Sequence, residues 1–112
     1  MKPEAQLSRS LYEHLALVWK PKCVYFAVPN SLVARDSFHV ANMKRQGLTP
    51  GVTDWVFLWW NGCGGIELKV NGNKQTPAQK GFEQWCNQEK VPYRIAESIE
   101  QCYSILKEWK RL

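Results

Sequence analysis

Hydrophobic residues recur at helical spacing across residues 4–19. They are Leu7, Leu11, Leu15, Val18 and Trp19. Such a set lies on one face of a helix, because positions three and four apart project from the same side. Pro21 cannot continue a helix, so we expect the first helix to end before it.

Short runs rich in β-branched and aromatic residues follow, separated by turn signals. We expect strands at Cys23–Val28, Asp54–Trp60, Ile66–Val70 and Pro92–Ala96. Pro29-Asn30 ends the first run, and the Pro-Gly pair at 50–51 marks a turn before the second.

Capping residues predict three further helices. Asp36 can cap a helix that runs through roughly Arg45, with Gly47 as its C-terminal stop. Thr76 is placed to be the N-cap of the next helix, with a proline at its first position and Gln79 at the capping-box position. A Ser at 98, with Gln three residues on, opens the last helix in the same way.

The predicted order is therefore α-β-α-β-β-α-β-α. The run Trp55–Trp60 is apolar on both faces, and a strand of this kind needs cover on both sides. We expect one α/β domain over residues 1–112, with a mixed four-stranded sheet flanked by helices.

An Asn-Gly dipeptide at 61–62 joins the two central strands and favours a two-residue type I′ turn. That turn would pair Asp54 with Lys69 and place Asp54, Glu67 and Lys69 on one face of the hairpin, with Glu67 diagonal to Asp54. This shared face depends on the register of the hairpin. A one-residue slip, such as a bulge at the glycines 64–65, would turn Asp54 to the opposite face.

These three side chains suit hydrolysis of a phosphodiester. Asp54 and Glu67 can converge on one Mg²⁺ or Mn²⁺ through carboxylate oxygens. A metal ion held there would lower the pKa of a bound water and polarise the phosphate. Lys69 can hold the attacking water and offset negative charge. The alternative is a surface cluster that makes an ordinary cross-strand ion pair.

Composition narrows the classes of partner and compartment. The formal net charge is +5, which is compatible with a polyanionic partner such as DNA but does not require one. No apolar run approaches the roughly 20 residues that span a bilayer. The polar N-terminus lacks the apolar stretch of a signal peptide, so we expect an intracellular, cytoplasmic protein.

Cysteines and tryptophans admit more than one role. The four cysteines form no Cys-x-x-Cys pair, so free thiols are favoured over zinc ligands or disulfides. The six tryptophans are expected to serve packing in the core or at a dimer interface, with base stacking as the alternative.

The order and spacing of several segments resemble a known family. Gly51–Asp54, then Glu67–Lys69 after a hairpin, then Thr76–Lys80 are similar to the virus-type replication-repair nuclease domain, VRR-NUC, of the PD-(D/E)xK nuclease superfamily. The similarity covers nearly the whole chain and includes an opening helix that carries Glu4. A Thr precedes Asp54 where the superfamily pattern has Pro, and the turn at 50–51 takes that role.

This resemblance implies a restriction-endonuclease-like fold and a metal-dependent endonuclease. The implied metal ligands are Asp54, Glu67, the backbone carbonyl of Leu68 and Glu4, and the implied catalytic residues are Asp54, Glu67, Lys69 and Gln79.

Two of these residues have simpler explanations. Gln79 fits the capping box by itself, although the two roles do not exclude each other. Glu4 can be a first-turn acid that favours the helix dipole, and Gln6 nearby blurs the match.

The resemblance also implies a homodimer that acts on branched DNA, with four-way junctions as a favoured substrate. Two sites related by a twofold axis suit paired cuts. Lys44, Arg45, Lys74 and Lys80 flank the site in sequence and are either phosphate contacts or solvated surface. The alternative functions are a non-catalytic nucleic-acid-binding protein with the same fold and an interaction protein that dimerises through its tryptophans.

Overall fold

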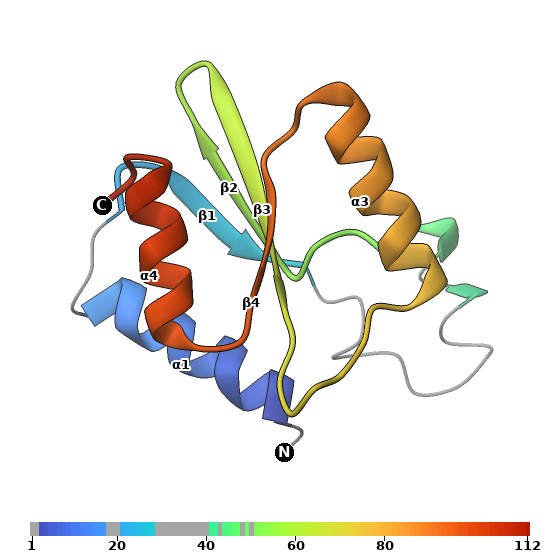
Figure 1. Ribbon diagram of the computed structural model, residues 1–112, viewed down its shortest axis with the longest axis horizontal. Coiled ribbons are helices and arrows are strands. Elements are labelled where there is room, and N and C mark those ends of the chain that lie inside the picture. Colours follow the sequence, from blue (N-terminus) through green and yellow to red (C-terminus); the bar gives the residue numbers. More distant parts are fainter. Residues whose placement is uncertain (1–2, 18–20, 29–40, 43, 48, 50) are drawn as a thin grey trace.

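Four strands form one sheet in the order β1-β2-β3-β4 (Figure 1). They are β1 (Val24–Ala27), β2 (Trp55–Trp59), β3 (Gly62–Leu68) and β4 (Tyr93–Ala96). β1 and β2 are antiparallel, as are β2 and β3, whereas β3 and β4 are parallel. The predicted mixed four-stranded sheet is therefore confirmed.

The computed structural model describes residues 3–17, 21–28, 41–42, 44–47, 49 and 51–112. Its helices include α1 (Pro3–Leu17), α3 (Pro77–Glu89) and α4 (Ile99–Glu108). Residues 41–42 and 44–45 are also helical, and Gly47 follows them with a φ of 104°, as expected for a helix stop. The predicted cap of that helix, Asp36, lies outside the described residues.

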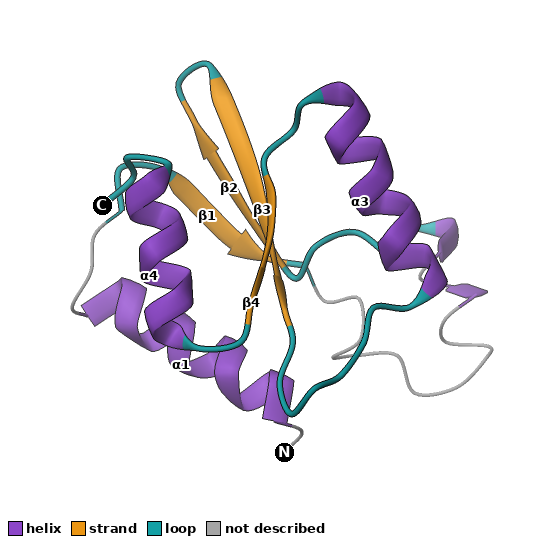
Figure 2. Ribbon diagram, in the orientation of Figure 1, coloured by secondary structure: helices purple, strands orange, loops and turns teal. Residues whose placement is uncertain are grey.

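Helices lie on both sides of the sheet (Figure 2). In this view α1 and α4 lie on one side and α3 on the other. The apolar core forms between the sheet and the α1–α4 layer, from Leu11, Leu15, Trp55, Phe57, Ile66, Leu68, Ala96, Cys102, Ile105 and Leu106. Within the described residues, no helix is long and apolar enough to span a membrane.

The β2–β3 hairpin turns one residue earlier than the sequence suggested. Trp59 pairs with Gly62, so the turn residues are 60–61, and the predicted type I′ turn at 61–62 is wrong. A Cβ on Gly62 would lie 2.4 Å from the Trp59 indole nitrogen, so this glycine makes room for the ring instead of forming the turn. The indole rings of Trp59 and Trp109 lie 5.9 Å apart, which keeps Trp59 in that place.

The new register changes the partner of Asp54. Trp55 pairs with Ile66, so Asp54 falls opposite Glu67, and the prediction that it faces Lys69 is wrong. The shift is two residues, which leaves every side chain on its predicted face. The pairing also continues without a bulge through the glycines at 64 and 65, so the one-residue slip does not occur.

A true left-handed turn forms at the second Asn-Gly of the chain. Asn71 has a φ of 56° and Gly72 a φ of 72°, and Asn73 N–H donates to the carbonyl of Val70 at 3.1 Å. Positive φ at both central residues is the mark of a type I′ turn. It reverses the chain just after β3.

The two faces of β2 differ in cover. Phe57 is fully buried beneath α1 and α4, whereas Leu58 is 43% exposed on the α3 side. Val24 and Phe26, which share that side, are also exposed. In the part of the chain that the structure describes, the expected cover on both faces of β2 is therefore only partly present.

The cysteines and tryptophans mostly meet the sequence expectation. All four cysteines are free and lie buried or half-buried. Trp55, Trp59 and Trp109 belong to the core or pack against it. Trp60 and Trp85 are exposed, so packing does not account for every tryptophan.

Candidate active site

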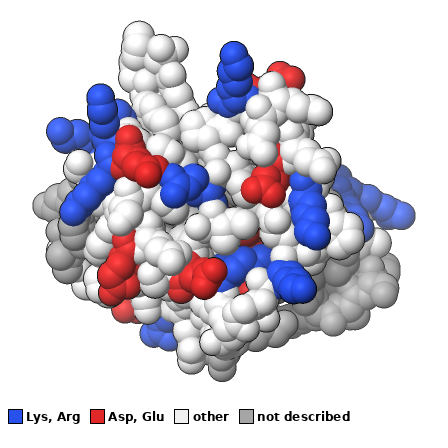
Figure 3. Space-filling view, in the orientation of Figure 1, with Lys and Arg blue, Asp and Glu red and all other residues white. Residues whose placement is uncertain are grey.

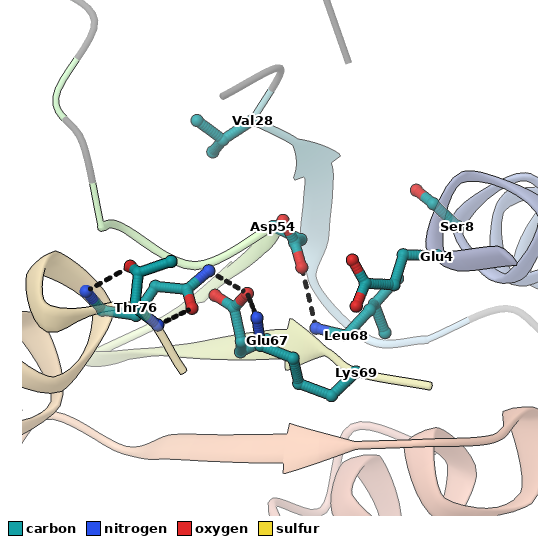
Figure 4. Close-up of a pocket in the computed structure, with 9 residues that line it drawn as sticks. Glu4, Ser8, Val28, Asp54, Glu67, Leu68, Lys69 and Thr76 are labelled. Carbon is teal, nitrogen blue, oxygen red and sulfur yellow. Dashed lines mark hydrogen bonds and ion pairs between the residues drawn. The ribbon is translucent and has the colours of Figure 1, made fainter. Parts of the chain in front are cut away.

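All the residues predicted for the site line one pocket on the α3 side of the sheet, with a volume of about 190 Å³ (Figure 4). Asp54 lies just before β2, Glu67 near the end of β3 and Lys69 just after it. The pocket is lined by Glu4, Ser8, Val28, Asp54, Glu67, Leu68, Lys69, Thr76 and Gln79.

A close approach to α3 places Asp54. Gly51 has a φ of 89°, and a Cβ there would lie 2.4 Å from the carbonyl oxygen of Ala78 in the first turn of α3. A glycine is therefore needed where the chain passes the helix and enters β2. At the end of this segment, Asp54 Oδ2 accepts a hydrogen bond of 2.8 Å from the backbone N–H of Leu68.

Glu67 is the most buried acidic side chain of the site. It is 1% exposed, and its Oε2 accepts a 2.7 Å hydrogen bond from Gln79 Nε2. Among the described residues, Oε1 has no hydrogen-bond partner although it is buried. A buried carboxylate oxygen without a partner is costly, so this atom calls for a proton or a cation.

Gln79 takes part in the capping box and the pocket at once. The side-chain Oε1 of Gln79 accepts a hydrogen bond of 2.9 Å from the backbone N–H of Thr76. The backbone N–H of Gln79 donates to Thr76 Oγ1 at 3.2 Å. The predicted capping box is thus confirmed. Because the side-chain amide oxygen is occupied by the cap, the amide nitrogen is directed at Glu67.

Lys69 shares the pocket with Glu67 and is almost as deeply buried. Its Nζ lies 4.0 Å from Glu67 Oε2, and the two side chains are 10% and 2% exposed. This burial contradicts the alternative of an ordinary surface ion pair. The backbone N–H of Lys69 donates to the carbonyl of Ala96 at 3.0 Å, which ties the site to β4.

Glu4 reaches the pocket from the first turn of α1. Its Oε2 accepts a hydrogen bond of 3.1 Å from Asn73 Nδ2. Asn73 was missed in the sequence analysis, although the Asn-Gly turn that precedes it is visible in the sequence. Glu4 therefore both occupies a first-turn position and lines the pocket.

Burial dominates the electrostatics of the two central carboxyl groups. It raises the pKa of Glu67 well above its usual range, and Asp54 raises it further, by its charge and by accepting the Glu67 proton in a hydrogen bond between the two carboxyl groups. Burial also raises the pKa of Asp54, while the hydrogen bond from Leu68 opposes that effect. The pair therefore resists carrying two negative charges unless a positive charge is bound beside it.

The donor set suits a hard divalent cation. In a strand, the N–H and C=O of one residue point to the same edge, so the Leu68 carbonyl is directed to the side on which Asp54 accepts its N–H. No group of three His, Cys, Asp or Glu side chains able to hold a metal occurs among the described residues. Mg²⁺ does not need one, because one or two carboxylates with waters and other oxygens suffice. The unpartnered Glu67 Oε1 fits the same role.

Four basic side chains flank the site residues in the sequence. Lys44, Arg45, Lys74 and Lys80 are all exposed. On the face shown in Figure 3, Lys and Arg are frequent over α3 and the segment beside it.

One solved structure, described as a VRR_NUC domain protein, has the same fold. It superposes with a TM-score of 0.69 and 18% sequence identity, over 96% of this chain and 88% of that chain. No family model matches the sequence, and no curated protein matches it. The chain therefore has the α/β fold of a VRR-NUC domain, as the order of its motifs predicted.

Proposed function

We propose that this protein is a divalent-metal-dependent endonuclease that hydrolyses DNA phosphodiester bonds. The observation that carries the proposal is the buried Glu67 carboxylate, which has an unpartnered oxygen and lies in one pocket with Asp54 and Lys69. The VRR-NUC fold supports the proposal. In this chain Asp54, Glu67 and Lys69 lie together at one end of the β2–β3 hairpin.

Asp54, Glu67 and the Leu68 carbonyl would hold Mg²⁺ or Mn²⁺. When bound, the ion supplies a Lewis acid for the phosphoryl oxygens and a lower pKa for a water ligand. Glu4 lies at the margin of this set, because its carboxylate is engaged by Asn73. We assign Glu4 to a supporting position that adds negative charge beside the ligands.

Lys69 acts on the reacting groups. Its ammonium lies in the same pocket and can orient the attacking water and offset charge on the phosphoryl oxygens. Replacing Lys69 should therefore reduce turnover more than metal affinity. Gln79 is a positioning residue, because it holds Glu67 Oε2 while its own orientation is set by the helix cap.

Branched DNA and a homodimer complete the proposal. The exposed Lys44, Arg45, Lys74 and Lys80 would contact phosphates, which provide affinity without sequence specificity. Val24 and Trp85 are exposed apolar side chains that a second copy of the chain would cover. Two sites related by a twofold axis would then make paired cuts in a four-way junction.

The test is a cleavage assay with Mg²⁺, Mn²⁺ or EDTA on duplex, flap, splayed and four-way DNA. We expect metal-dependent cutting by the parent protein and its loss in Asp54→Ala, Glu67→Ala and Lys69→Ala. The matched controls are Glu89→Ala and Lys22→Ala, two exposed residues away from the pocket. Equal cutting by the site variants would refute the assignment, and binding without cutting would favour the non-catalytic alternative.

A further inference from the structure

A second pocket lies between α1 and the edge strand β1, next to the candidate active site. It has a volume of about 440 Å³ and an apolar lining that includes Ser8, Arg9, Tyr12, Tyr25, Phe26 and Trp55. Its size falls in the range of sites that take small organic ligands. The proposed nuclease chemistry uses only one of these residues, Ser8, and that one only as part of the pocket wall.

The walls of this pocket are aromatic. Tyr12 is 58% exposed, and Tyr25, which faces α1 from β1, is half-buried. Tyr25 packs against Trp55 with ring centroids 6.2 Å apart, so the floor of the pocket is held in place by the core. Nucleobases stack on exposed aromatic rings that the fold holds in place, and this stacking does not depend on the nucleotide sequence.

The two pockets share Ser8 as a common wall. Its Oγ accepts a hydrogen bond of 2.9 Å from the Trp55 indole, which directs its own proton away from Trp55. In Figure 4, Ser8 projects from α1 beside Glu4 and Asp54. A DNA strand with one phosphodiester at Asp54 would therefore bring a neighbouring nucleotide to the aromatic pocket.

The open edge of β1 adds polar groups to the pocket. Val28 N–H donates to the carbonyl of Asp54, so antiparallel alternation turns the backbone N–H and C=O of Tyr25 and Ala27 away from β2. Both residues line the pocket, and β1 pairs only with β2 in the described part of the chain. These groups can meet the donors and acceptors on the edge of a base.

We propose that this pocket binds an unpaired nucleobase of the strand whose phosphodiester lies at the candidate active site. The inference rests on the proposed nuclease function and specifies its substrate class. A base inside a duplex is stacked and paired and would have to be extruded first, at a cost. The pocket therefore favours DNA with unpaired nucleotides beside the cut, such as splayed arms and open junctions.

Binding of a fluorescent splayed DNA, with Ca²⁺ in place of Mg²⁺, tests the proposal. Tyr12→Ala should weaken binding by roughly 5- to 100-fold, the effect of losing one base–aromatic stack, and should leave binding to the paired duplex unchanged. Tyr12→Phe should bind as the parent does. Trp60→Ala removes an exposed aromatic at the hairpin tip and should have no effect.

A splayed DNA with abasic nucleotides next to the fork tests the base itself. The parent should bind this substrate as weakly as Tyr12→Ala does, and the variant should not distinguish the two DNAs. Parent binding that is indifferent to the abasic change would overturn the proposal. A Tyr12→Ala protein that changes from dimer to monomer with unaltered DNA affinity would also overturn it, since the pocket would then be an interface between copies.

Hydrolysis of bis(p-nitrophenyl) phosphate, a diester without a base, separates the two proposals. If Tyr12→Ala weakens splayed-DNA binding and no protein hydrolyses any diester, the base pocket stands and the nuclease proposal fails. If the parent cleaves DNA and the small diester but Tyr12→Ala binds splayed DNA normally, the base pocket alone fails.

Discussion

The two faces of the β2–β3 hairpin differ in chemistry, because one carries buried apolar side chains and the other carries buried ionisable side chains. On one face Phe57 and Ile66 are fully buried in the apolar layer beneath α1 and α4. On the other face Glu67 is as deeply buried, but it lies beside another carboxyl group and a lysine. The first face stabilises the fold, and the second holds two carboxyl groups that resist carrying two negative charges together. The contrast separates the residues that stabilise the fold from those that we propose to bind the metal ion.

The largest effect on this comparison should come from the apolar face. Phe57→Ala removes a fully buried ring and should lower the free energy of unfolding by about 3–5 kcal/mol. Leu58→Ala, the next residue on the opposite face, is its matched control and should cost less than half as much, because Leu58 is 43% exposed. Urea denaturation measures both, and similar losses for the two variants would show that the faces do not differ.

Metal binding should change the stability of the charged face only. A ligand that binds the folded state alone adds about 2.7 kcal/mol at 100 times its dissociation constant. Mg²⁺ or Mn²⁺ should therefore raise the melting temperature of the parent but not of Glu67→Gln. An equal rise in both proteins would place the metal elsewhere.

The pH dependence of stability sharpens the same contrast. The pKa of Glu67 is raised on folding, so the folded state holds its proton at pH values where the unfolded state has lost it. Metal-free protein should become less stable as pH rises above the ordinary range of a glutamate, by at most about 1.4 kcal/mol per pH unit for this group. In Glu67→Gln the decline should be smaller. Unfolding curves between pH 5 and pH 8 test this, and identical slopes would contradict it.

The smallest effect should come from the link between the helix cap and the pocket. Gln79→Ala removes the capping-box acceptor and should destabilise the protein by about 1 kcal/mol. Gln79→Glu keeps an acceptor for Thr76 N–H but puts a second negative charge beside Glu67 Oε2. We expect Gln79→Glu to retain the cap yet cleave DNA more slowly than the parent. Cleavage that tracks stability alone in the two variants would reduce Gln79 to a cap.

Local signals in the sequence were sufficient for the order of the described elements and for the face of each site residue. The strand predicted at Ile66–Val70 instead runs over Gly62–Leu68. The Thr76 cap depends on residues close in sequence. So does the way successive side chains of β2 and β3 point to opposite faces of the sheet. The exact partner of Asp54 was not, because it depends on the Trp59 ring occupying the space above Gly62. The prediction of a shared face survived because the shift was two residues.

Contacts between distant segments were beyond the sequence. The approach of Gly51 to Ala78 and the hydrogen bond from Asn73 to Glu4 join parts of the chain that no local pattern connects. The depth at which Glu67 is buried was also unforeseen, since it depends on a hydrogen bond from Gln79 in α3 and on the pocket walls that distant segments supply. The same residue types could also form an exposed cluster on the surface. The long-range contacts are what bury them in one pocket.

The most direct test of the central claim is the rate of DNA cleavage as a function of Mg²⁺ concentration, for the parent and Glu67→Gln. The substitution keeps the size and shape of the side chain and removes only its charge. We expect parent cleavage to rise and saturate with Mg²⁺, and Glu67→Gln to cleave at least about 100-fold more slowly at every concentration while remaining folded. Equal rates at equal Mg²⁺ would contradict the assignment of the buried carboxylate pair as the metal site.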